Sequence, residues 1–177
     1  MVWKAAFLIP LTMNTRTIII VLVILAVLSV IMRKMKNTTT GKILSALKIR
    51  VDAKGDGHYG ASRDGGSRGH NGVDLEVIKG QPVYAPFAGT ITKQAYPYSD
   101  DRKFTGVHLT RPDGLKIKVF YMLPKPGIIG KAVNAGDEIG RAQAISEKYG
   151  APMKDHIHVE VWNKNGTLEN PQEFFGI

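Results

Sequence analysis

Four side chains at two separate places in this sequence have the types and spacing of a metal site. His70 and Asp74 stand four residues apart, and His156 and His158 stand two residues apart near the other end of the chain. Two imidazoles and one carboxylate with a vacant fourth position form a typical catalytic zinc site, because zinc needs an open coordination place to activate water. These residues therefore indicate a metal-dependent hydrolytic centre.

The residues around the second pair predict a strand. His156 and His158 alternate with three apolar residues, which is the two-residue period of a strand. The apolar positions are Ile157, Val159 and Val161. Successive strand side chains point to opposite faces, so both histidines share a face with Glu160 and Trp162. Taken alone, such a pair is more commonly found on a solvent-facing strand, and His70 and Asp74 could simply hydrogen-bond a glycine-rich loop.

The order of these residues resembles one family. His-x-x-x-Asp followed much later by His-x-His is similar to the lysostaphin/LytM-type zinc metallopeptidases, which cut peptidoglycan peptides. The resemblance covers roughly residues 55–165. Residues 80–91 and 133–140 contain further sequence motifs that support it. The local sequence of residues 59–91 is similar to that of the leukocyte chemotaxin relative. That relative keeps the zinc fold but is regarded as non-proteolytic.

The resemblance implies a role for each candidate residue. His70, Asp74 and His158 correspond to the zinc ligands, with Zn²⁺ as the cofactor and a peptidoglycan peptide as the substrate. His156 would lie beside the metal as a catalytic residue. There it could orient water or stabilise the oxyanion that forms when an amide carbonyl is attacked.

One position departs from the family pattern. Active members usually carry a second non-ligand histidine in a Tyr-x-His-Leu phrase on a central strand, and the matching phrase here is residues 120–123. Met122 is then expected at the histidine's place, where a thioether can neither transfer a proton nor donate a hydrogen bond. Tyr121 is expected to point to the opposite face. His108 on the partner strand is a possible catalytic substitute, and His58 is a second candidate although a solvated loop position suits it better.

Two functions from different classes follow. The first is a zinc-dependent metalloendopeptidase of the peptidoglycan hydrolase type, favoured by the intact ligand set and by His156. The second is a catalytically weak or inactive zinc-binding module that recognises cell-wall peptide or a protein partner. Met122 and the sequence similarity to the chemotaxin favour this second function. We favour the peptidase. A lipoyl-like carrier hairpin is a poor third, because no lysine stands at a tight hairpin tip between hydrophobic neighbours.

Length and composition limit the alternatives. A chain of 177 residues has room for one domain of ordinary size and an appendage. Its net charge is +9, but residues 1–36 contain five basic and no acidic residues, so the remainder is only mildly basic. No run of Lys and Arg indicates nucleic-acid binding. The absence of cysteine excludes disulfides and thiolate ligands, and the oligomeric state stays open.

The N-terminal region predicts a membrane anchor over residues 1–36. Residues 17–32 are uncharged and mostly apolar, and basic residues flank them at Arg16, Arg33 and Lys34. A helix over this run could span a bilayer if the flanking side chains extend to the interface. We expect a single-pass protein of the inner membrane with a periplasmic or extracellular domain, although the basic residues after the run favour the reverse orientation. A signal peptide is the rival prediction, but no small-x-small cleavage site follows.

The rest of the chain predicts a mainly β fold. After a linker over residues 37–54, short apolar runs separated by turn signals in residues 55–177 indicate a compact antiparallel β-sheet or barrel-like domain. The turn sequence Arg-Pro-Asp-Gly predicts a hairpin between residues 107–110 and 115–121. Beyond the anchor, only residues 143–149 suggest one or two turns of helix.

Overall fold

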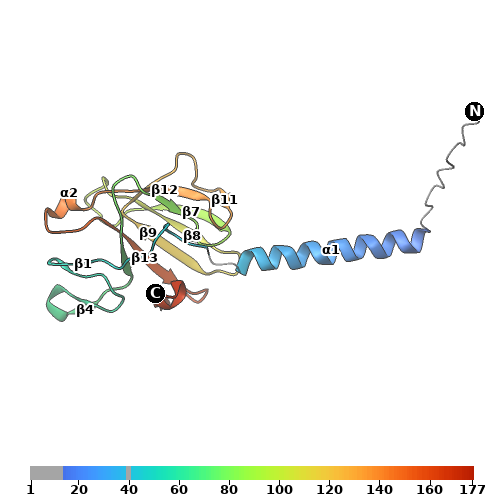
Figure 1. Ribbon diagram of the computed structural model, residues 1–177, viewed down its shortest axis with the longest axis horizontal. Coiled ribbons are helices and arrows are strands. Elements are labelled where there is room, and N and C mark those ends of the chain that lie inside the picture. Colours follow the sequence, from blue (N-terminus) through green and yellow to red (C-terminus); the bar gives the residue numbers. More distant parts are fainter. Residues whose placement is uncertain (1–13, 39–40) are drawn as a thin grey trace, which may run out of the picture. The chain divides into compact units, whose positions relative to one another are not determined.

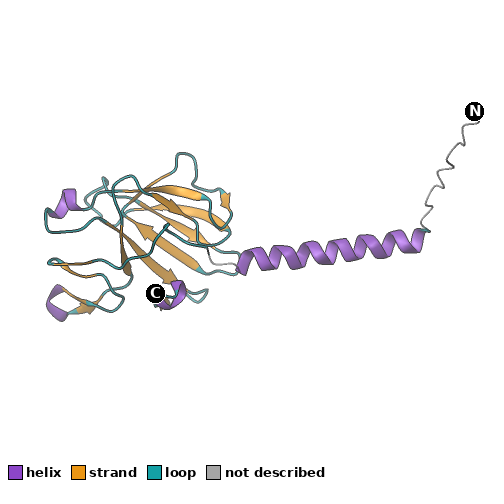
Figure 2. Cartoon of the chain, in the orientation of Figure 1, coloured by secondary structure: helices purple, strands orange, loops and turns teal. Residues whose placement is uncertain are grey.

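Antiparallel strands provide most of the regular structure that follows the first helix (Figure 2). The computed structural model describes residues 14–38 and 41–177. The chain divides into two units, Met1–Met35 and Lys36–Ile177. All the site residues expected from the sequence belong to the second unit.

Helix α1 spans Thr15–Thr38 and contains the predicted apolar run. Asn14 caps its N-terminus, because the Asn14 Oδ1 accepts a hydrogen bond from the Thr17 N–H at 2.9 Å. Among the described residues, no helix combines the length and the apolar character that a membrane crossing requires. The transmembrane helix predicted within residues 1–36 is therefore not supported, and residues 1–13 of that prediction lie outside the described part.

Residues 41–177 form many short strands and a few helical turns (Figure 1). The strands are β1 (Val51–Asp52), β2 (Gly55–Asp56), β3 (Ser62–Arg63), β4 (Arg68–Gly69), β5 (Val73–Glu76), β6 (Pro82–Tyr84), β7 (Gly89–Ala95), β8 (Gly106–Thr110), β9 (Lys116–Phe120), β10 (Met122–Pro124), β11 (Ala132–Val133), β12 (Glu138–Ala142), β13 (His156–Trp162) and β14 (Leu168–Glu169). The helical segments are η1 (Asp64–Gly66), α2 (Ser146–Tyr149) and α3 (Pro171–Phe175).

A seven-stranded sheet and a three-stranded sheet carry the fold. The larger has the order β11-β7-β8-β9-β13-β14, with β5 also paired to β13, and the smaller has the order β10-β12-β6. Every strand pair in the described residues is antiparallel. The prediction of a mainly β, antiparallel fold is confirmed.

The core lies against one face of the larger sheet. Side chains that alternate along β9 and β13, among them Val119 and Val159, are completely buried there. Val83 and Ile139 of the smaller sheet belong to the same apolar cluster. Each such side chain contributes about 1.5–3 kcal/mol on leaving water. The two-residue period therefore directs the intervening polar side chains, including His158, to the opposite face.

The predicted hairpin and the predicted helical turn are both present. In the turn between β8 and β9, the Arg111 N–H donates to the Leu115 carbonyl at 2.8 Å, and Gly114 takes a φ of +95° that favours glycine. Helix α2 forms within residues 143–149. The sequence interpretation missed α3, although Asn170 at its N-cap, followed by proline, is a recognisable start signal.

The segment predicted as a linker, residues 37–54, is largely part of the domain. Ile43 and Leu44 are completely buried in the core, and Ile49 forms an isolated β-bridge with Leu75. Sequence patterns do not show this packing, because only the folded sheet provides the surface against which the pair packs. Residues 39–40 of the predicted linker lie outside the described part.

Candidate metal centre

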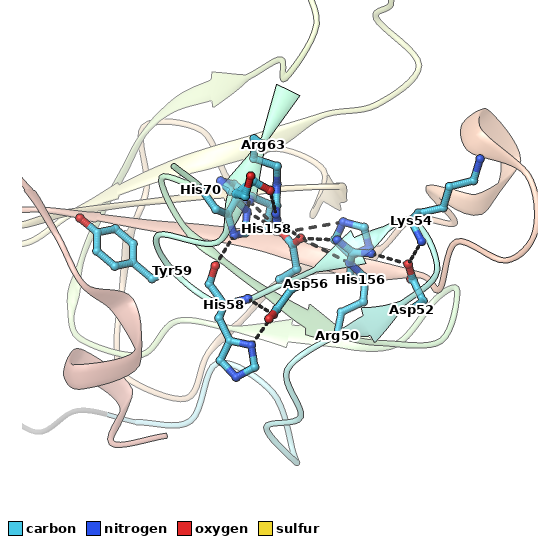
Figure 3. A network of polar contacts seen from close by, with 12 residues as sticks. Arg50, Asp52, Lys54, Asp56, His58, Tyr59, Arg63, His70, His156 and His158 are labelled. Atoms are coloured by element: carbon cyan, nitrogen blue, oxygen red, sulfur yellow. Dashed lines mark hydrogen bonds and ion pairs between the residues drawn. The ribbon is translucent and has the colours of Figure 1, made fainter. Parts of the chain in front are cut away.

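Strand pairing brings the two predicted motifs together. Strand β13 pairs with β5 so that His158 lies directly opposite Asp74. His70 stands just before β5, at the end of the loop that contains β1–β4, and Figure 3 shows its ring beside His158. Gly72 permits this approach, because a Cβ there would lie only 2.6 Å from His158 Cε1. Residues from opposite ends of the domain therefore form one cluster.

Three potential ligand atoms in the cluster face one another. His158 Nδ1 lies 3.0 Å from His70 Nε2 and 2.9 Å from Asp74 Oδ1. Asp74 Oδ1 lies 3.2 Å from His70 Nε2. Among the described residues these three form the one group with the geometry to hold a metal ion. Atoms at such separations can all lie about 2 Å from a single zinc ion, so the donor set fits zinc.

Each imidazole has a second partner that determines which nitrogen faces the cluster. His70 Nδ1 donates to the His58 carbonyl at 2.9 Å, so Nε2 keeps its lone pair. His158 Nε2 faces Glu160 Oε1 at 3.6 Å, which leaves Nδ1 toward the cluster. Burial opposes charge on His158, but contacts with Asp74 and Glu160 raise its pKa.

Glu160 is itself held in place by two other side chains. Its Oε2 accepts from Trp162 Nε1 at 2.8 Å and lies 2.9 Å from Lys118 Nζ. Burial would raise the pKa of Glu160, but hydrogen bonding with His158, Lys118 and Trp162 lowers it to about 2. A carboxylate that stays ionised therefore faces the far side of the His158 ring.

Asp74 presents its two oxygens to different partners. Oδ1 faces the histidines, whereas Oδ2 accepts from Arg50 Nη2 at 3.0 Å and Nε at 3.3 Å, and lies 3.5 Å from Arg63 Nη2. Burial would raise the pKa of Asp74, but hydrogen bonds with His158 and His70 hold it well below its usual range. The group is a buried, fully ionised carboxylate surrounded by cations and imidazoles.

His156 lies beside the cluster with one nitrogen directed toward Asp74. Its Nδ1 donates to the Lys154 carbonyl at 2.8 Å, and its Nε2 lies 3.8 Å from Asp74 Oδ1. Burial lowers the pKa of His156 in spite of the nearby Asp74 charge, so the ring is neutral at neutral pH. A neutral imidazole with Nε2 toward the cluster can accept a proton there.

Tyr121, not Met122, occupies the position next to His156. The ring centroids of Tyr121 and His156 are 5.3 Å apart in an edge-on arrangement. Met122, in contrast, is completely buried in the apolar core. The expectation that Met122 faces the site is wrong. Tyr121 has a φ of +61°, which breaks the strand alternation where the chain leaves the larger sheet for the smaller one. As a result, Phe120 and Tyr121 both line the site although they are consecutive.

The other two histidines are not part of the cluster. His108 lies on β8 opposite Lys118 of β9, and Lys118 lies opposite Glu160 of β13. His108 is therefore on the same face of the sheet as His158. It is aligned with Glu160, however, and not with His158. It does not line the groove around the cluster as the described residues define it. The His58 ring is exposed and contacts Asp56, while only its carbonyl reaches the cluster.

The cluster lies in a groove of about 480 Å³. The groove is lined by Arg50, Lys54, Arg63, Arg68, His70, Asn71, Asp74, Tyr96, Pro97, Tyr98, Phe120, Tyr121, Ile145, Tyr149, Met153, His156, His158 and Glu160. Tyr98 Oη lies 3.2 Å from Tyr121 Oη and 2.9 Å from Tyr149 Oη. Burial, opposed by the Tyr98 contact, raises the pKa of Tyr121 to about 12, so its phenol remains a hydrogen-bond donor.

Sequence reasoning missed two residues at this site. Arg50 stood in the predicted linker, where its place between Ile49 and Val51 in a short alternation was the available signal. Tyr121 had no comparable signal, because a left-handed backbone at a tyrosine cannot be read from residue types. Both enter the site through tertiary geometry.

Comparisons with known proteins find a matching family and similar relatives. The family model of peptidase family M23 matches residues 68–171. Leukocyte cell-derived chemotaxin-2 of Bos taurus is 32% identical over 128 residues, which cover 72% of this chain and 79% of that protein. The resemblance expected from the sequence is confirmed.

Two solved structures share the fold. Lysostaphin from Staphylococcus simulans, described as an antimicrobial peptidase, superposes with a TM-score of 0.58 at 24% identity over 78% of this chain and 55% of its own length. A zinc-containing peptidase from Vibrio cholerae gives a TM-score of 0.55 at 20% identity over 76% of this chain and 39% of its own length. The chain spans about half of lysostaphin, and these likenesses concern the fold.

His108 generates a prediction for stability against pH. Burial, followed by the charges of Lys118, Lys116 and Lys93, lowers its pKa to about 4 from an ordinary value near 6.5. Between these values the unfolded chain binds a proton that the folded chain does not, so folding becomes less favourable as pH falls. The His108→Asn variant should therefore lose less stability than wild type as the pH falls from 7 to 4, by about 1–2 kcal/mol once solvent screening of this half-buried group is allowed for.

Urea unfolding of both proteins at several pH values measures this difference. The comparison cancels the carboxylates that titrate over the same range in both chains. A difference in unfolding free energy that stays constant from pH 7 to pH 4 would contradict the account of His108.

Proposed function

This chain belongs to peptidase family M23, and we propose that it is a zinc-dependent metalloendopeptidase acting on peptidoglycan peptides. The observation that carries the proposal is the convergence of His70 Nε2, Asp74 Oδ1 and His158 Nδ1 at mutual distances of 2.9–3.2 Å. A fourth side chain, His156, lies beside them with its Nε2 3.8 Å from Asp74 Oδ1. Membership of the family and the resemblance to lysostaphin/LytM-type enzymes support the choice of substrate.

The three converging atoms are the proposed zinc ligands. A zinc ion held there would lower the pKa of a water molecule and polarise the carbonyl of a bound amide. The chain provides the rest of the arrangement. The His58 carbonyl and Glu160 fix the two ligand imidazoles, and the groove receives the peptide.

Two further side chains are assigned to proton transfer and charge stabilisation. His156 is neutral at neutral pH and directs Nε2 toward the cluster, so it can accept a proton from the attacking water. Tyr121 keeps its phenolic hydrogen and lies next to His156, so it can donate a hydrogen bond to the oxyanion. Tyr121 would thus do part of the work for which active relatives use a second histidine.

The ligand assignment predicts a division among the four site residues. The purified chain should bind about one zinc ion. The variants His70→Ala, Asp74→Ala and His158→Ala should each bind zinc at least 10- to 100-fold more weakly, because the loss of a residue that only supports a ligand already has that effect. The His156→Ala variant should keep its zinc. Metal analysis after dialysis measures all five proteins, and zinc loss from His156→Ala equal to that from His158→Ala would refute the division.

A second function is favoured by two observations. Met122 stands where active relatives carry a second histidine and is buried in the core, and the chain is similar to leukocyte cell-derived chemotaxin-2 over most of both lengths. A zinc-binding module that recognises cell-wall peptide or a protein partner without cutting would have the same metal ligands. Hydrolysis is the property that separates the two functions.

The hydrolysis test compares variants at equal zinc content. The zinc-loaded wild type should release peptide fragments from purified peptidoglycan, and His156→Ala should lose at least about 100-fold in rate. Tyr121→Phe should lose about 100- to 1000-fold because one oxyanion donor is removed. Tyr84→Phe, on β6 away from the groove, is the matched control and should retain the wild-type rate. If the fully loaded wild type releases no fragments, the recognition module is the correct function.

For the location, we propose the cell envelope, with the domain periplasmic or extracellular. Peptidoglycan lies outside the cytoplasm, and α1 exposes apolar side chains such as Ile20 and Leu22, which are 58% and 60% exposed. A protease added to intact spheroplasts should digest the domain. Protection of the domain under these conditions would place it in the cytoplasm and would contradict the proposal.

A further inference from the structure

Arg50 is a buried cation that the family match does not include. It precedes the matched residues 68–171, and its side chain is only 4% exposed. Full burial of an arginine is unusual unless the guanidinium is paired. Figure 3 shows that this side chain belongs to the polar network around the histidine cluster.

The guanidinium makes contacts with two carboxylates. Nη2 and Nε lie 3.0 and 3.3 Å from Asp74 Oδ2, and Nη1 lies 2.8 Å from Asp52 Oδ1. Asp74 therefore has one oxygen bound by the arginine fork, while Oδ1 is left for the histidines. Two guanidinium donors that converge on one oxygen hold that oxygen on the side of the arginine, and Asp52 in turn holds the guanidinium.

The backbone holds the same two residues in register. The Arg50 N–H donates to the Asp74 carbonyl at 2.9 Å, and the Arg50 carbonyl accepts from the Gly57 N–H at 2.8 Å. The Gly57 carbonyl then accepts from the Asp74 N–H at 2.9 Å. A Cβ at Gly57 would lie 2.7 Å from the Arg50 oxygen and 2.8 Å from Asp74 Cβ, so only glycine fits between them.

We propose that Arg50 is a positioning residue of the metal centre, which holds Asp74 so that Oδ1 alone is presented as a ligand. The proposal rests on the zinc site of the proposed function. A carboxylate can bind a metal through one oxygen or two, and an arginine that occupies Oδ2 selects the first arrangement. The functional domain accordingly begins before residue 50, inside the segment that sequence patterns indicate as a linker.

The Arg50→Lys variant tests this role. Lysine keeps the charge but offers a compact ammonium in place of the fork, so Asp74 should lose its fixed orientation. The zinc affinity of the folded variant, measured by competition with a chelator, should fall by about 10- to 100-fold. The absorption spectrum of the cobalt(II)-loaded protein should change as well, because it reports the arrangement of ligand atoms.

Arg111→Lys is the matched control. Arg111 also donates to an aspartate through Nε at 2.9 Å and Nη2 at 2.7 Å, but to the two separate oxygens of Asp113, in the turn between β8 and β9. Its replacement should leave zinc affinity and the cobalt spectrum unchanged. The full chain is used throughout, and unfolding free energies of the metal-free proteins are measured in parallel.

Each outcome decides a different point. If Arg50→Lys binds zinc with an affinity within twofold of wild type, the positioning role is overturned and the metal centre is left intact. This holds whether or not the variant is less stable. Absence of zinc from the wild type would overturn the metal centre and this inference together. If Arg50→Lys does not fold, Asp52→Asn decides, because it weakens the hold on Nη1 while it keeps an oxygen at that place. A folded Asp52→Asn protein should bind zinc more weakly than wild type, and unchanged affinity would overturn the proposal.

Discussion

The buried carboxylate of Asp74 is the constraint on which the rest of this domain depends. An ionised carboxylate away from water is costly unless every oxygen has a partner. Here Oδ2 is bound by Arg50 and approached by Arg63, while Oδ1 faces His70 and His158. Several elements must therefore be placed correctly around a single side chain, and the fold can be understood as the means of placing them.

The larger sheet supplies that placement through its register. Strand β13 lies between β5 and β9, so His158 on its polar face stands beside Asp74 on one side and Phe120 on the other. The opposite face of the same strand, including Val159, is fully buried. One alternating strand thus joins the core to the cluster, and a slip of one residue in its pairing would turn the histidines into the core.

The site also shows how a shared fold can accommodate different chemistry. The ligand-type atoms of His70, Asp74 and His158 converge as in a zinc centre, but the neighbouring position belongs to a tyrosine. A phenol whose pKa is raised to about 12 keeps its proton at neutral pH and so can donate a hydrogen bond. Under the proposed function it would stabilise a developing oxyanion, and proton transfer would be the role of His156.

The sequence by itself determined the four clustered residues and the antiparallel β fold, because a two-residue period and short-range spacing are local properties that each segment carries alone. Only the tertiary structure decided which residues complete the site. Tyr121 replaced Met122 there because its left-handed backbone, set where the chain crosses between sheets, reverses the expected alternation. Arg50 entered because residues 24 positions apart meet only through backbone pairing. Contacts of this kind depend on how the chain packs, so no single segment encodes them.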